Sequence, residues 1–103
     1  MTTASHAISF DPASGTLHVD GRSIQLTGIE RRLVALFAER LGEAVAHHEI
    51  RTKVWGEGWS GGDEALRVTV NRLRKKFEGN QRKPEILVSV RGVGYRMVGR
   101  RAG

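Results

Sequence analysis

The sequence predicts an α+β fold in which a small N-terminal antiparallel sheet is followed by three helices and a C-terminal β-hairpin. Three observations support this order. Residues 7–26 contain short runs of alternating apolar and polar residues, separated by turns rich in Gly, Pro and Asp. Residues 27–79 contain apolar residues spaced three and four apart, as on one face of a helix. Residues 86–98 alternate again on both sides of a turn that contains Arg91 and two glycines.

The composition is typical of one soluble globular domain with a single modest core. The chain has 103 residues, of which 39% are hydrophobic and 27% are charged. It contains no cysteine, which excludes disulfides and thiolate metal sites. The sequence also lacks the ~18 consecutive apolar residues that a membrane span needs, and it lacks the layout of a signal peptide. We therefore expect a cytoplasmic protein that does not contact a membrane.

The net charge of +6 is unevenly distributed along the chain. Residues 1–50 contain four arginines and six acids, for a charge of about −2, whereas residues 51–103 contain 13 Lys and Arg and five acids, for about +8. A strongly basic half suggests a polyanionic partner for that half. Charge alone leaves a solvated basic surface open as the alternative.

No motif for catalysis or metal binding is found in the sequence. The glycine-rich segment 56–62 lacks the Lys and the Ser or Thr of a phosphate-binding loop and follows no predicted strand. His47 and His48 are adjacent, without the i, i+4 spacing that places two metal-binding histidines on one face of a helix. We therefore expect neither an enzyme nor a protein that binds a metal or another cofactor.

The first helix is predicted to begin after Thr27 and to end near Gly42. Thr27 and Glu30 form a T-x-x-E capping box, in which each side chain accepts a hydrogen bond from a free N–H at the helix start. Gly42 is a natural C-terminal stop. The apolar residues that share one face of this helix are Ile29, Leu33, Leu36 and Phe37.

A second, shorter helix is predicted near residues 47–55. Its N-cap position is Ala46, which is a poor cap, so we expect this helix to fray readily at its start. The following loop, residues 56–62, contains four glycines. It also contains Trp59, whose side chain either packs on the domain or contacts a partner.

The third helix, from about Asp63 to Phe77, has one apolar and one polar face. At 100° per residue, the residues of the buried stripe are Leu66, Val70, Leu73 and Phe77. The residues on the opposite side are Glu64, Val68, Asn71, Arg72 and Lys75. We expect Asp63 to cap the start of the helix and Gly79 to close its end.

The polar face of this helix is unusual for a helix that only faces solvent. Such a helix more often mixes Glu with Lys, whereas here a small apolar residue and an Asn lie among cations. Arg74 lies at the edge of the buried stripe. It is expected to pair either with an acid such as Glu39 or Glu43, or with a phosphate.

Four segments resemble, in sequence and in order, the OmpR/PhoB-type winged-helix DNA-binding domain, which is typically the output half of two-component response regulators. The segments are LTGIERRLVALF, KVWG, VNRLRKKFE and VSVRGVGYRM. A basic helix followed at this distance by R-G-x-G-Y is a specific combination. The resemblance covers about residues 7–98. It implies a winged helix-turn-helix fold over residues 7–99, and we expect residues 1–6 and 100–103 to be flexible.

The resemblance implies that the chain binds double-stranded DNA at specific sequences, as the output domain of a transcriptional response regulator. The helix at about 63–77 would lie in the major groove, and the wing, residues 86–98, at the minor groove. Arg72 would contact a base and Val68 a thymine methyl group. Arg91 at the wing tip would enter the minor groove.

The other contacts that the resemblance implies are with the DNA backbone. Ser89 and Tyr95 match wing residues that lie near phosphates, and Trp55 matches a Trp beside the backbone. The amide of Asn71 would either pair with an adenine or face solvent. The full set of candidate DNA-binding residues is Trp55, Val68, Asn71, Arg72, Arg74, Lys75, Ser89, Arg91 and Tyr95.

Several residues of the third helix differ from the pattern of the family. Glu64 and Ala65 stand where Arg or Ser and Thr are frequent, and Arg67 replaces a frequent Asp. Asn71 stands where an Arg is often found. These differences remove one cation and one hydroxyl from the face that would contact DNA.

The resemblance also implies partners. RNA polymerase would be contacted through the loop 56–62, and a receiver domain and a histidine kinase would belong to the system of the full-length protein. We expect the domain to be a monomer alone and to pair on DNA. Two alternatives remain open: a winged helix that serves as a protein-interaction module, and the DNA-binding domain of a regulator without a receiver domain.

Overall fold

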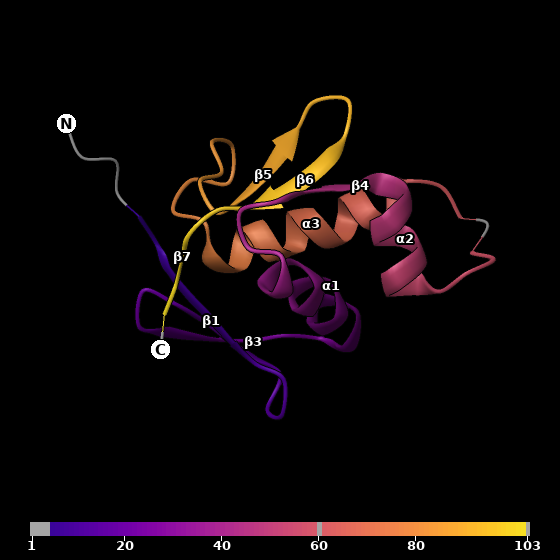
Figure 1. Cartoon of the computed structure of the whole chain (residues 1–103). Coiled ribbons are helices and arrows are strands. Elements are labelled where there is room, and N and C mark those ends of the chain that lie inside the picture. The colour runs from indigo at the N-terminus through magenta and orange to yellow at the C-terminus, as the bar shows by residue number, and fades with distance from the viewer. Residues whose placement is uncertain (1–4, 60, 103) are drawn as a thin grey trace.

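The computed structural model describes residues 5–59 and 61–102, and its elements follow the predicted α+β order (Figure 1). The elements are β1 (Ala7–Asp11), β2 (Thr16–Val19), β3 (Arg22–Gln25), α1 (Gly28–Glu39), β4 (Ala44–Ala46), α2 (His47–Trp55), α3 (Glu64–Phe77), β5 (Leu87–Val90), β6 (Gly94–Met97) and β7 (Arg100–Arg101). The helices α1 and α3 lie between the N-terminal strands and the β5–β6 hairpin, as Figure 1 shows. The predicted winged helix-turn-helix fold is confirmed.

Two sheets lie on either side of α1 and α3, and each contains one strand that the sequence did not predict. The N-terminal sheet has the strand order β3-β2-β1-β7, and the C-terminal sheet has the order β4-β6-β5. The strand β4 pairs antiparallel with β6, so that Val45 lies opposite Tyr95. The short strand β7 pairs parallel with β1. In the C-terminal sheet, β6 is therefore paired along both edges, with β5 of the hairpin on one side and β4 on the other.

The strand β7 lies beyond the predicted boundaries 7–99. Arg100, in a segment expected to be flexible, donates its backbone N–H to the carbonyl of His6 at 2.8 Å, and Ala102 donates to Ile8 at 2.9 Å. These bonds attach the end of the chain to β1. Of the segment 1–6, the first four residues lie outside the described ones.

His6, which also lies in a segment expected to be flexible, has two side-chain partners in the structure. Its ring nitrogens lie 2.6 Å from Asp20 Oδ2 and 2.8 Å from Glu85 Oε1. The hydrogen bond to Asp20 and, after it, the bond to Glu85 raise the pKa of His6 above its ordinary value. The side chain thus connects the start of β1 to the segment that leads into β5. These partners are 14 and 79 residues away in sequence, too far for local sequence patterns to indicate.

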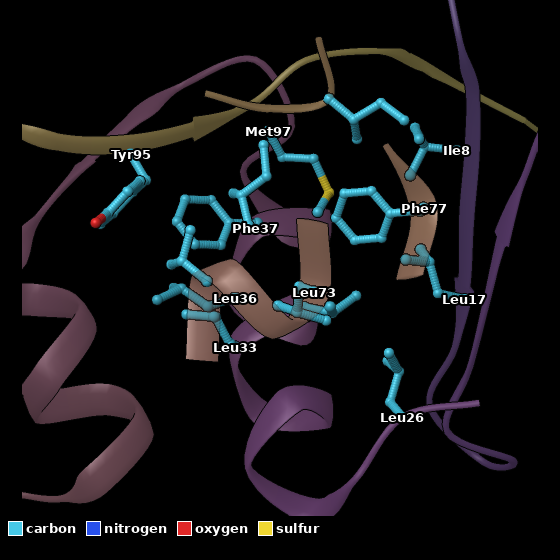
Figure 2. Packing of buried hydrophobic residues seen from close by; sticks show 14 of the residues in the cluster. Ile8, Leu17, Leu26, Leu33, Leu36, Phe37, Leu73, Phe77, Tyr95 and Met97 are labelled. Atoms are coloured by element: carbon cyan, nitrogen blue, oxygen red, sulfur yellow. The ribbon is translucent and has the colours of Figure 1, made fainter. Parts of the chain in front are cut away.

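The apolar stripe of α3 forms the centre of the core, as predicted. Its four residues, Leu66, Val70, Leu73 and Phe77, are at most 1% exposed. Figure 2 shows Phe77 between Met97 of β6 and Leu17 of β2, so one side chain joins both sheets. Burying a side chain of this kind stabilises the fold by roughly 1.5–3 kcal/mol.

The capping box at the start of α1 is confirmed, and its acid has a second function. Glu30 Oε1 accepts the backbone N–H of Thr27 at 3.0 Å, and Thr27 Oγ1 accepts that of Glu30 at 3.4 Å. The carboxylate also accepts a hydrogen bond of 2.5 Å from Lys76 of α3, and Glu30 is only 2% exposed. Burial disfavours its charged form, but the bonds from Lys76 and Thr27 outweigh burial and hold the pKa of Glu30 below its ordinary value. The cap therefore joins α1 to α3.

Two predicted helix ends differ from the structure. The side chain of Asp63 does not cap α3, because it forms an ion pair of 2.8 Å with Arg51 of α2. The helix α1 ends at Glu39, before Gly42, which adopts a φ of +88° and donates its N–H to the carbonyl of Met97 at 2.8 Å. That bond directs the chain into β4.

Substitution of Leu73 by alanine tests the position of the core. We expect Leu73→Ala to lower the free energy of unfolding by about 2–5 kcal/mol, because this fully buried side chain would leave a cavity. Val68→Ala, on the exposed face of the same helix, is the control and should change stability by less than about 0.5 kcal/mol. Chemical denaturation measures both, and equal effects would contradict the assignment of the two faces.

The pH dependence of stability tests the pair of Glu30 and Lys76. Glu30→Gln keeps an acceptor for the N–H of Thr27 but removes the charge, and should cost roughly 1–3 kcal/mol at pH 7. The folded-state pKa of Glu30 is lowered, so its stabilisation is present above the unfolded-state value of about 4.3. It is lost as the pH falls through the folded-state pKa. The stability difference between wild type and Glu30→Gln should therefore shrink on acidification, and a constant difference from pH 7 to pH 3 would refute the role of the charge.

Candidate nucleic-acid interface

The exposed face of α3 has the composition predicted from the helical wheel. The residues that face solvent on it are Glu64, Arg67, Val68, Asn71, Arg72 and Lys75. Arg67 lies 3.6 Å from Glu64 on the same helix, in a solvent-exposed pair. Within residues 5–59 and 61–102, neither Arg72 nor Lys75 forms an ion pair. Both cations are therefore available to an external anion.

The wing projects from the body of the domain beside α3, as Figure 1 shows. Its tip is a tight turn closed by a bond of 3.0 Å from the N–H of Val93 to the carbonyl of Val90. Gly92 has a φ of +77°, a conformation that glycine adopts without strain. Arg91 is exposed at this turn. The neighbouring Val93 is 42% exposed, so the tip presents one cation and one apolar side chain.

The second glycine of the wing allows close packing of β4. A Cβ on Gly94 would lie 2.0 Å from the carbonyl oxygen of Val45. His47, at the start of α2, donates its backbone N–H to the carbonyl of Val93 at 3.1 Å. The start of α2 therefore supports the wing tip, a contact that the sequence did not indicate because β4 is only three residues long.

Arg74 binds the wing, and of its two alternatives the ion pair with Glu39 or Glu43 is not found among the described residues. Its Nε donates to the carbonyl of Leu87 at 2.9 Å, and its Nη2 donates to Ser89 Oγ at 3.2 Å. Leu87 and Ser89 are both residues of β5, so this side chain links α3 to the hairpin.

Tyr95 completes the group around Arg74. It lies opposite Ser89 in the hairpin, and its ring centre is 5.8 Å from the guanidinium carbon of Arg74. The ring of His47 meets it edge-on at 5.6 Å. Tyr95 is only 9% exposed, but Figure 2 shows its hydroxyl pointing away from the core.

Trp55 lies apart from this group, at the end of α2. Its ring is half-buried and stacks on that of Trp59, with centres 6.1 Å apart and planes 23° apart. Trp59 remains 43% exposed. The two alternatives for Trp59 are therefore compatible, since one side packs on Trp55 and part of the ring stays accessible.

The excess of basic residues in the second half is partly used inside the domain. Among its 13 Lys and Arg, five side chains contact groups of the protein itself within the described residues: Arg51 contacts Asp63, Arg67 contacts Glu64, Arg74 contacts β5, Lys76 contacts Glu30 and Arg101 contacts the carbonyl of Ala38. The count of charges therefore overestimated the free basic surface. The helical wheel placed Lys75 on the exposed face, but it did not indicate that Lys76 would bind Glu30, because that contact depends on where α1 lies.

In the part of the chain that the structure describes, no group of three His, Cys, Asp or Glu residues could hold a metal ion. Likewise, no helix among the described residues is long and apolar enough to cross a membrane.

Comparison with known proteins relates this architecture to a family. The family description "Transcriptional regulatory protein, C terminal" matches residues 21–97. The transcriptional regulatory protein YvrH of Bacillus subtilis is 31% identical over 90 residues, which are 87% of this chain and 38% of that protein. The DNA-binding dual master transcriptional regulator RpaA of Synechocystis is 37% identical over 75 residues, 73% of this chain and 31% of that protein. The chain thus spans less than half the length of these relatives.

Solved structures share the fold. The DNA-binding domain of E. coli CpxR has a TM-score of 0.74 and 28% identity, and the match covers 96% of this chain and 97% of that one. The Klebsiella pneumoniae RstA DNA-binding domain, in complex with the RstA box, has a TM-score of 0.77 at 23% identity, with 93% and 95% of the two chains covered. From the match to residues 21–97 and these neighbours, we conclude that the chain belongs to the C-terminal domains of transcriptional regulatory proteins, the winged-helix effector domains of the OmpR/PhoB type.

Proposed function

We propose that the chain binds double-stranded DNA at specific sequences, as the output domain of a transcriptional response regulator. The observation that carries this proposal is the position of two exposed basic elements side by side in one domain, joined by a hydrogen bond from α3 to β5. The polar face of α3 presents Arg72 and Lys75, and the adjacent wing presents Arg91. The relatives support the proposal, because RpaA is described as DNA-binding and the CpxR structure is that of a DNA-binding domain.

The exposed residues of α3 have the chemistry needed to read bases in the major groove. An Arg such as Arg72 can donate two hydrogen bonds to guanine, and the amide of Asn71 can pair with adenine. Val68, 36% exposed, is suited to a thymine methyl group. Specificity would therefore come from this face, on which Asn71 and Glu64 make the pattern particular to this chain.

Other candidate residues are suited to the DNA backbone. Lys75 is exposed beside Arg72, and Ser89 and Tyr95 are paired across the wing, one position from the Val90–Gly94 pair that precedes its tip. Such contacts orient a protein on the duplex without selecting a sequence. Trp55 would contact the backbone from the end of α2.

The alternative function is that of a protein-interaction module, and the exposed part of Trp59 is the observation that favours it. Single exposed apolar residues are nevertheless common on soluble proteins. DNA binding predicts a linear fall of the logarithm of affinity with the logarithm of salt concentration. Selection of bound sequences from random duplexes would identify the operator, and failure to enrich any sequence would favour the interaction module.

The full-length protein is proposed to contain a receiver domain controlled by a histidine kinase. The basis is that this chain covers only 38% of YvrH and 31% of RpaA, so its relatives are much longer. We further propose that the domain acts in the cytoplasm without catalytic activity of its own. It would be a monomer that pairs on DNA, one copy per half-site, and would contact RNA polymerase through the loop 56–62.

Substitution of Arg72 tests base recognition. Arg72→Ala should weaken binding to the selected operator by about 1–3 kcal/mol and flatten the preference at one base pair. Lys75→Ala, three residues along the same exposed face, is the matched control and should weaken binding to all sequences alike. Titrations of both variants with operator and random duplexes distinguish a base contact from a phosphate contact. An equal loss on both duplexes for Arg72→Ala would make it a phosphate contact.

Substitution of Arg91 tests the wing. Arg91→Ala should leave stability within about 0.5 kcal/mol, because the side chain is exposed at a turn. Binding should weaken more on duplexes with an A·T-rich flank, whose narrow minor groove has a stronger negative potential, and the salt slope should fall by about one. Arg82→Ala, which removes an exposed cation from the α3–β5 loop, is the control for the loss of charge. If Arg91→Ala and wild type bind A·T-flanked and G·C-flanked duplexes in the same ratio, the wing does not enter the minor groove.

A further inference from the structure

Arg74 directs its polar contacts at the wing, although it belongs to the helix proposed to read the major groove. Its Nε is bonded to Leu87 at 2.9 Å and its Nη2 to Ser89 at 3.2 Å. Its guanidinium carbon lies 5.8 Å from the ring centre of Tyr95. The three partners belong to both strands of the hairpin, because Ser89 and Tyr95 are paired across β5 and β6. One side chain of α3 thus contacts both strands of the hairpin.

The chemistry of arginine suits this arrangement. The guanidinium is planar and its N–H donors point in fixed directions, so two hydrogen bonds and an aromatic contact set its position and orientation together. A lysine ammonium in the same place would keep the positive charge. It would lack the plane and the fixed pair of donors, and it could not reproduce both hydrogen bonds in one orientation.

The attachment points lie close in sequence to both residues that are proposed to read DNA. Arg74 follows Arg72 by two residues on α3, and Ser89 precedes Arg91 by two residues on the wing. On the other side of the hairpin, the backbone N–H of His47 holds Val93. The link through Arg74 therefore joins α3 to the wing close to both of these residues.

We infer that Arg74 is a positioning residue, which clamps the wing to α3 and so determines how the minor-groove contact of Arg91 is placed relative to the major-groove contact of Arg72. Two of its N–H donors, on Nε and Nη2, are bonded to the wing, and on this inference its effect on DNA binding passes through the wing. The consequence for DNA binding rests on the proposed function, whereas the clamp itself is a property of the free domain.

The variant Arg74→Lys tests this inference, because it retains a charge that a phosphate contact needs but loses the clamp. In the free protein, amide hydrogen exchange in β5 and β6 should accelerate by roughly fivefold to tenfold, because the hairpin opens more easily. On DNA, the variant should lose the preference for A·T-flanked over G·C-flanked duplexes, as Arg91→Ala does, and the salt slope should fall by about one. Binding to the G·C-flanked duplex should change by less than about twofold.

A double-mutant cycle with Arg91→Ala completes the test. If Arg74 acts through the wing, Arg74→Lys should have no further effect on flank preference once Arg91 is absent. Two outcomes would make Arg74 a phosphate contact and overturn the inference. In the first, the losses of flank preference caused by the two substitutions add. In the second, Arg74→Lys lowers the affinity equally on both duplexes and leaves hydrogen exchange unchanged. Unchanged exchange overturns the clamp whatever the DNA result. If exchange accelerates but wild type binds both duplexes alike, the clamp stands, while the proposed wing function and the role of Arg74 in DNA choice both fail.

Discussion

The helix α3 packs its apolar stripe against the N-terminal sheet, α1 and the hairpin at the same time, and the other elements are arranged around this contact. Phe77 reaches both sheets, and Leu73 is fully buried beside α1 (Figure 2). Because the stripe occupies one side of the helix, the opposite side must face solvent. The need to bury these residues therefore determines which side chains of α3 are available to a partner.

The end of α3 is held by polar contacts that complement this packing. The carbonyl of Phe77 accepts a hydrogen bond of 2.9 Å from Arg22 of β3, which satisfies one of the free carbonyls at the helix end. The carboxylate of Glu78 accepts the backbone N–H groups of residues 85–87, with the bond to Leu87 at 2.8 Å. One acid thereby fixes the point at which β5 begins. Lys76, which binds Glu30 of α1, directly precedes Phe77 and Glu78. Three consecutive residues at this end of the helix therefore bind three different parts of the domain.

These internal contacts change the interpretation of the basic charge. Consecutive cations of α3 have different environments, since Arg74 binds the wing, Lys75 faces solvent and Lys76 binds Glu30. Neighbouring positions on a helix are 100° apart, so a basic run necessarily points in several directions. Only the members on the outer face belong to the proposed DNA surface. The others contribute to the geometry of that surface by joining the helix to the wing and to α1.

Much of the fold, and the identity of the outer face of α3, were determined by the sequence alone. Periodicity and the box of Thr27 and Glu30 are local signals, because they depend on residues three or four apart that a helix brings together. The exposure of Arg72 and Arg91 followed from the same reasoning and is seen in the structure.

Only the tertiary structure decided the contacts between residues that are distant in sequence. His6 binds Asp20 and Glu85, the strand β4 adds to the hairpin, and the end of the chain pairs with β1. The partner of Arg74 was also undecided in the sequence, where a carboxylate or a phosphate was expected and a backbone carbonyl of β5 was found. A local pattern states which face of an element is buried, but not which element covers it. Hydrogen bonds across that contact depend on packing angles that a single sequence does not encode locally.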